Sequence, residues 1–204
     1  MIGTELNGIG ISGVSTKRGT GSLDTREKIL NVSVELFMEN GYPGTPLSLI
    51  ASKLGFSKAA LYYHFKNKDD ILNGILNPLL DRIDALLEEA PQRFTDAESR
   101  WKFLVTYSDL MLSDPRAVSV LAIGGSQVWL PESIYNRIER HRVRTIELTM
   151  LPGMSDEEKV RSILLMDMMH RETVFDKRRF VIDGMTPERR REIVYSFIKK
   201  SFED

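Results

Sequence analysis

Apolar residues recur every three or four positions along most of the chain, and no stretch alternates with the period of two that is typical of strands. Gly, Pro and capping residues separate the helical segments, which predicts an all-α fold of about nine helices. Residues 1–23 are rich in Gly, Ser and Thr and lack periodicity, which predicts a flexible arm. The expected helices span roughly 24–40, 46–54, 57–65, 68–89, 96–111, 114–124, 131–150, 155–183 and 186–198.

The helix expected at 68–89 carries a proline in its interior. Asn67 suits its N-cap, and Pro78 removes one of its backbone hydrogen bonds. We therefore expect a kink near Gly74, which is either a static bend or part of a signalling movement.

Two short helices and the turn between them stand out in the first third of the chain. Thr45 is a suitable N-cap for the first of them, and Gly55 can take the left-handed conformation that ends it. Ser57 can cap the second helix, whose Leu61 and Phe65 lie four apart and share an inward face. Two short helices joined by such a turn predict a helix-turn-helix motif.

The outward face of the second short helix has the composition of a DNA-reading surface. Small residues allow close approach to base edges, while tyrosine hydroxyls, imidazole and lysine suit phosphate oxygens. A solvated helical hairpin with exposed tyrosines is the alternative, and Tyr62 could instead be partly core. The expected base-edge contacts are Ser57, Lys58, Ala59 and Ala60, and the expected phosphate contacts are Thr45, Ser48, Tyr62, Tyr63, His64 and Lys68.

Charge is distributed unevenly, although the net charge is only −1. Residues 17–68 carry a net +4 and residues 69–204 a net −4. A basic N-terminal module on an acidic body fits binding to phosphate by one end.

Residues 61–68, Leu-Tyr-Tyr-His-Phe-Lys-Asn-Lys, resemble the TetR family of transcriptional regulators, and the match extends back to Gly41-Tyr42 and forward to Ile71-Leu72. The resemblance implies a three-helix DNA-binding domain at 24–70 and a helical effector-binding and dimerisation domain at 71–204. It also implies a homodimer paired through the last two helices, which binds double-stranded operator DNA of near-palindromic sequence. Such regulators are most often repressors that a small molecule releases from DNA.

The C-terminal body concentrates aromatic and methionine side chains, which suit an apolar or amphipathic effector. Ordinary core packing is the alternative for each of them. Asp167 and His170 lie among apolar neighbours and could orient a ligand, or form a solvated or interface pair. The remaining candidates for the effector site are Trp101, Phe103, Tyr107, Met111, Trp129, Met166, Met169 and Phe175.

Nothing in the sequence indicates an enzyme. The chain has no cysteine, its three histidines lack metal-ligand spacing, and no phosphate-binding or dinucleotide motif occurs. We therefore expect no catalytic site, metal or cofactor. No segment has the composition of a membrane span or secretory signal, which predicts a cytoplasmic location. The rival function is a helical small-molecule carrier or receptor without specific DNA binding, which lacks salt-dependent affinity for duplex DNA.

Overall fold

The computed structural model describes residues 18–91, 94–123, 130–174 and 184–203. These ranges contain nine helices and no strand, so the predicted all-α fold is confirmed. The helices are α1 (Arg18–Asn40), α2 (Leu47–Leu54), α3 (Lys58–His64), α4 (Lys68–Glu89), α5 (Ala97–Leu112), α6 (Pro115–Ile123), α7 (Glu132–Thr149), α8 (Asp156–Val174) and α9 (Pro187–Glu203).

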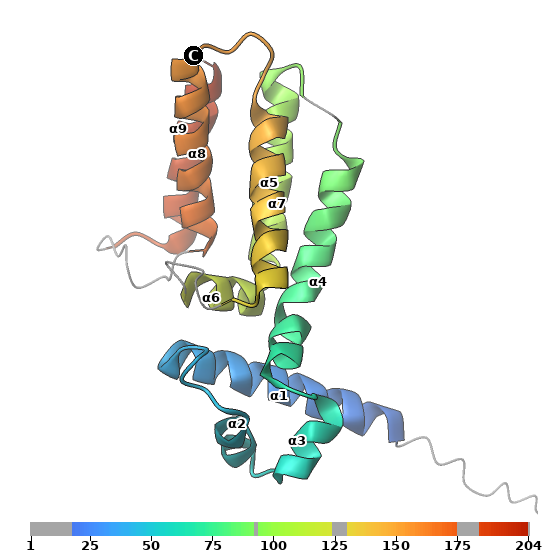
Figure 1. Cartoon of the computed structure of the whole chain (residues 1–204). Helices are drawn as coiled ribbons and strands as arrows, with labels where there is room; N and C mark the ends of the chain where they lie inside the picture. Colours follow the sequence, from blue (N-terminus) through green and yellow to red (C-terminus); the bar gives the residue numbers. More distant parts are fainter. Residues whose placement is uncertain (1–17, 92–93, 124–129, 175–183, 204) are drawn as a thin grey trace, which may run out of the picture.

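Helices α1, α2 and α3 form one end of the molecule, which we call the head, and α4 leads from it into the body (Figure 1). In the body, α8 packs on α5, α6 and α9, while α7 packs on α4. The short helix α6 lies between the body and α1 and contacts both. The head therefore meets the body through α4 and α6.

Side-chain caps begin several helices, and the caps predicted at Ser57 and Asn67 are among them. Ser57, Asn67 and Asp96 each accept a hydrogen bond from the backbone N–H three residues later, at 3.1, 2.7 and 2.8 Å. Ser155 and Glu158 form a reciprocal capping box at 2.7 and 3.3 Å. These bonds satisfy backbone donors that a helix N-terminus leaves unpaired.

The start of α1 differs from its expected position. Helix α1 begins at Arg18, six residues before the expected Asp24, so the last part of the expected arm is helical. Its Gly-Thr-Gly-Ser opening has no strong helix-start signal, which is why periodicity missed it. The rest of the arm and the end of the helix expected at 155–183 lie outside the described residues.

Helix α4 packs against both the head and the body. Gly74 lies against the head, where a Cβ atom would come within 3.1 Å of Leu30 Cδ2 and 3.3 Å of Phe65 Cε1. Pro78 lies inside the helix one turn later. The buried positions of α4 run along both halves and are Ile71, Leu72, Ile75, Leu76, Leu79, Leu80, Ile83 and Leu87.

Helices α8 and α9 expose large apolar side chains on the surface of the body. Leu164 is 60% exposed and Phe197 is 56% exposed, and both line a shallow groove with Val160 and Met168. Leu165 and Met169 of α8 are buried and face inward. Among the described helices, none is both long and apolar enough to cross a membrane.

Candidate nucleic-acid interface and ligand cavity

Helix α3 presents its predicted outward face to solvent. Leu61 and Phe65 are 1% and 2% exposed, as expected for the inward face. Tyr62 is 52% exposed and Tyr63 is 82% exposed, so both rings reach the surface of α3. Four further residues at the start of this surface are exposed, namely Ser57, Lys58, Ala59 and Ala60.

Helix α1 holds the C-terminal end of α3 in place. Arg26 Nη1 donates a hydrogen bond to the His64 carbonyl at 3.1 Å, and its guanidinium lies 4.2 Å from the Phe65 ring centroid. A cation near the last carbonyls of a helix is favourable because these carbonyls carry partial negative charge. The His64 ring is half-buried and packs edge-on against Tyr63, with 5.1 Å between centroids. The exposed face of α3 therefore has a fixed orientation on the head.

The structure corrects the expectations for Thr45. Its side chain is fully buried, and its hydroxyl donates to the carbonyls of Leu36, at 3.1 Å, and Gly41, at 2.8 Å. Pro46, which makes no side-chain capping bond, occupies the N-cap position of α2 instead. Thr45 therefore neither caps α2 nor reaches a phosphate. Ser48, one turn later, is exposed.

Lys68 lies at the start of α4, half-buried against the turn that precedes α2. Its Nζ donates to the Tyr42 carbonyl at 2.6 Å and lies 4.2 Å from the Tyr42 ring centroid. Burial lowers the pKa of Lys68, against the raising effect of Asp69. The Tyr42 hydroxyl donates to Asp69, and burial with this bond raises the pKa of Tyr42. A phosphate contact by Lys68 stays a prediction, since an ammonium has two further N–H donors.

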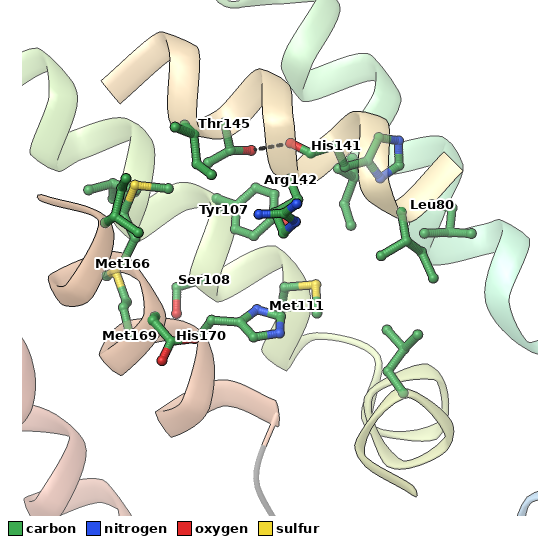
Figure 2. Close-up of a pocket in the computed structure, with 17 residues that line it drawn as sticks. Leu80, Tyr107, Ser108, Met111, His141, Arg142, Thr145, Met166, Met169 and His170 are labelled. Carbon is green, nitrogen blue, oxygen red and sulfur yellow. Dashed lines mark hydrogen bonds between the residues drawn. The ribbon is translucent and has the colours of Figure 1, made fainter. Parts of the chain in front are cut away.

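A cavity of about 220 Å³ lies in the body, lined by α4, α5, α6, α7 and α8. Figure 2 shows Leu80 of α4 and the two methionines of α8 on opposite sides, with the Tyr107 ring between them. Packing brings together six of the residues expected at an effector site, namely Tyr107, Met111, Met166, Asp167, Met169 and His170.

Two other expected members of the site lie elsewhere in the core. Trp101 packs edge-on against Tyr195, 6.1 Å between centroids, and Phe103 packs against Phe94 at 5.2 Å. Neither lines the cavity, because their positions on α5 turn them toward other neighbours. Trp129 and Phe175 lie outside the described residues.

Sequence reasoning missed the polar wall that α7 adds to the cavity. His141 is 4% exposed, and its Nε2 forms a hydrogen bond with the Asp84 carboxylate of α4. Arg137 Nε donates to the same carboxylate at 2.9 Å, and its Nη2 to Asp81 at 2.6 Å. His141, Thr145 and Arg137 recur at intervals of four, and this polar stripe was a usable signal in the sequence.

The protonation states of this wall follow from burial and hydrogen bonding. Burial lowers the pKa of His141, against the raising effect of Asp84. Burial alone would raise the pKa of Asp84, but hydrogen bonds from His141 and Arg137 outweigh it and hold that pKa below its usual value. His141 is therefore a neutral imidazole whose Nε2–H donates to an ionised carboxylate.

Tyr107 and Ser108 are neighbouring polar residues of α5 at the cavity. The Ser108 hydroxyl is hydrogen-bonded to the Tyr195 hydroxyl of α9. The Tyr107 hydroxyl has no hydrogen-bond partner within the described part of the chain, and burial raises the pKa of Tyr107 to about 12. Tyr107 is thus a neutral phenol with unused hydrogen-bonding capacity beside the cavity.

Helix α6 reaches both the cavity and the head. Its Leu121 lines the cavity, and Arg116 Nη1 lies 2.5 Å from Glu27 Oε2 of α1. Ala117 on the same helix is fully buried. Helix α6 therefore contacts both the cavity and the head, as α4 does.

Comparison with known proteins places this arrangement in a family. The model for bacterial regulatory proteins of the tetR family matches residues 29–75, which include α2, α3 and the start of α4. The negative transcriptional regulator IcaR of the biofilm operon icaADBC, from Staphylococcus epidermidis, is 29% identical over 117 residues. That match covers 57% of this chain and 60% of IcaR.

The transcriptional regulator QacR of Staphylococcus aureus is 44% identical over 55 residues, which are 27% of this chain and 29% of QacR. The chain thus matches less than two thirds of the length of either relative. A transcriptional regulator of the TerR/AcrR family from Aquifex aeolicus has the same fold, with a TM-score of 0.58 at 20% identity over 88% of this chain and 98% of its own. The helix-turn-helix head of the chain belongs to the tetR family of bacterial regulatory proteins, and the chain as a whole shares the fold of this solved structure.

Proposed function

We propose that the chain is a ligand-responsive transcriptional regulator, most simply a repressor, that binds near-palindromic operator DNA as a homodimer. The observation that carries this proposal is the exposed polar face of α3, held on a helix-turn-helix head. Tyr63 projects from that face and is 82% exposed, while Leu61 behind it is buried. Its relatives IcaR and QacR are transcriptional regulators, and IcaR is a negative one.

The exposed apolar surface of α8 and α9 supports the homodimer. Leu164, Val160 and Phe197 together form a contiguous apolar groove, which a monomer would leave in contact with water. Two copies related by a two-fold axis would cover this surface and place two α3 helices about 34–36 Å apart, one turn of duplex DNA.

Release from DNA follows from the two connections between cavity and head. A ligand that contacts Leu80 of α4 and Leu121 of α6 touches the two helices that connect the cavity to α1. A ligand that fits the cavity better in one arrangement of these helices shifts the dimer toward that arrangement. Operator affinity then changes by the same coupling free energy.

A fluorescence-anisotropy titration tests DNA binding. The labelled DNA is a fragment selected by the protein from genomic fragments, and the competitor is the same fragment scrambled. Tyr63→Phe removes one hydroxyl per subunit from the α3 face and leaves the ring packed on His64. Loss of two phosphate hydrogen bonds of about 1 kcal/mol each predicts roughly thirtyfold weaker operator binding. The salt dependence should be unchanged, because no charge is removed.

Tyr135→Phe is the matched control, since Tyr135 is an exposed tyrosine of α7. It should leave operator affinity within twofold of the wild type, roughly the precision of the assay. Equal affinity for selected and scrambled DNA, with no effect of Tyr63→Phe, would favour the carrier function instead. Size-exclusion chromatography with light scattering tests the dimer, and Leu164→Glu should convert it to monomers, because the substitution places a charge in the apolar groove.

A further inference from the structure

The interior of the α4–α8 cavity is uncharged. Three ionisable residues among its described lining, Arg142, Asp167 and His170, are exposed and therefore lie at the cavity mouth. The buried ionisable residue of the wall, His141, is neutral and already donates to Asp84. An ionised group inside the cavity would lose its hydration without gaining a counter-charge, which is strongly unfavourable.

The Arg142 cation at the mouth is already paired with a carboxylate. Arg142 Nη2 donates to Glu139 at 2.7 Å, and Arg142 Nε donates to the same carboxylate at 3.1 Å. Asp167 and His170 both have interaction partners of their own. Arg142 therefore offers no unpaired positive charge to an anionic ligand.

The Tyr107 hydroxyl supplies a specific hydrogen-bonding position. It is a neutral phenol at the cavity with no hydrogen-bond partner in the described residues, whereas the hydroxyls of Ser108 and Thr145 are satisfied within the protein. A polar atom removed from water without a partner is unfavourable, so a ligand that offers a partner gains affinity over one that does not.

The size and the lining of the cavity further limit the kinds of ligand that fit it. The cavity of about 220 Å³ exceeds the roughly 150 Å³ of an apolar cavity that admits benzene, so it suits a molecule of one substituted ring or two small rings. Three methionines, Met111, Met166 and Met169, line it beside the Tyr107 ring. Thioether sulfurs pack favourably against aromatic rings and adapt to their shape.

We propose that the effector is a small, uncharged aromatic molecule whose hydroxyl or carbonyl oxygen pairs with the Tyr107 hydroxyl. This inference rests on the proposed regulator function, because it names the ligand class of that same cavity. Tyr107 is then the residue that distinguishes an oxygen-bearing ligand from a hydrocarbon of the same shape, and the uncharged interior distinguishes it from ionised analogues.

Isothermal titration calorimetry on the full chain at neutral pH, without DNA, tests the proposal with four probes of matched shape. The probes are 4-propylphenol, propylbenzene, 4-propylbenzoate and 4-propylbenzylamine, which are respectively a neutral phenol, a hydrocarbon, an anion and a cation. We expect the phenol to bind about tenfold or more tightly than either ionised probe. Tyr107→Phe should weaken phenol binding by about three- to tenfold and leave propylbenzene binding unchanged.

Tyr135→Phe serves as the control variant, because Tyr135 lies on α7 and does not line the cavity. Circular dichroism of each variant verifies that it is folded before titration. An ionised probe that binds as tightly as the phenol, equal phenol affinity of wild type and Tyr107→Phe, or no binding of any of the four probes would each overturn the proposal. The DNA titration is separate, so selective operator binding by the same preparation would leave the regulator function standing.

Discussion

Gly74→Ala is a small change at the place where α4 meets the head. The new Cβ atom would lie 3.1 Å from Leu30 Cδ2, 3.3 Å from Phe65 Cε1 and 3.5 Å from Arg26 Nη2. Leu30 is 3% exposed and Phe65 is 2% exposed, and the Arg26 guanidinium covers the Phe65 ring at 4.2 Å. These neighbours have little room to withdraw, so the added methyl group must push α4 away from α1 and α3.

Two opposing effects decide whether Gly74→Ala raises or lowers the free energy of unfolding. Alanine is favoured over glycine within a helix by about 1 kcal/mol, because glycine loses more backbone entropy on folding. Adding a methyl group to a well-packed core costs about 1–3 kcal/mol, with about 2 kcal/mol as the middle of the range. We therefore expect Gly74→Ala to lower the free energy of unfolding by about 1 kcal/mol.

Urea denaturation followed by circular dichroism measures this loss, with Leu30→Val and the double variant as controls. Valine removes the Cδ2 atom that the new Cβ would meet, so in the Leu30→Val background Gly74→Ala should be close to neutral or stabilising. The two substitutions should then couple by about 1 kcal/mol in a double-mutant cycle. A higher urea midpoint for Gly74→Ala alone, or additive effects in the cycle, would refute the packing argument.

Three further changes probe residues with defined hydrogen bonds or burial. Thr45→Val should lower the free energy of unfolding by about 1–2 kcal/mol, because the buried Thr45 hydroxyl donates to two backbone carbonyls. Operator affinity should be unchanged. A selective loss of DNA binding would contradict the burial argument. Ser57→Ala removes the N-cap of α3 and should cost about 1 kcal/mol in urea denaturation, and a cost near zero would show that the cap contributes nothing. Burial lowers the pKa of His141 below its ordinary 6.5, so its contribution to stability is complete above pH 6.5 and is lost as the pH falls through the folded-state pKa. Melting temperatures should therefore fall less steeply below pH 6.5 in His141→Gln than in the wild type, and equal slopes would contradict the assignment.

The parts of the fold that the sequence predicts correctly are set by contacts between near neighbours in the chain. The caps at Ser57 and Asn67 depend on one side chain and a backbone N–H three residues away. The inward face of α3 follows from the spacing of Leu61 and Phe65 alone. Such signals are complete within a single turn of helix, so no knowledge of the tertiary structure is needed.

The candidate sites were only partly predictable, because their geometry depends on segments far apart in the chain. Thr45 has the composition of a helix cap, but tertiary packing brings its hydroxyl to the carbonyl of Leu36, nine residues earlier. Asp84 and His141 are 57 positions apart, so their hydrogen bond has no local signal. Aromatic composition alone could not separate Tyr107, which lines the cavity, from Trp101, which does not.

The packing of Gly74 against Leu30 and Phe65 limits where the chain can be truncated or fused to another protein. A head excised at residue 70, where the sequence suggests a domain boundary, would lose the helix that covers these two side chains. It would also remove the buried residues Ile71 and Leu72 from their neighbours. A chimaera that attaches this head to another regulator should therefore carry α4 as far as Pro78, where the helix already lacks one backbone N–H donor.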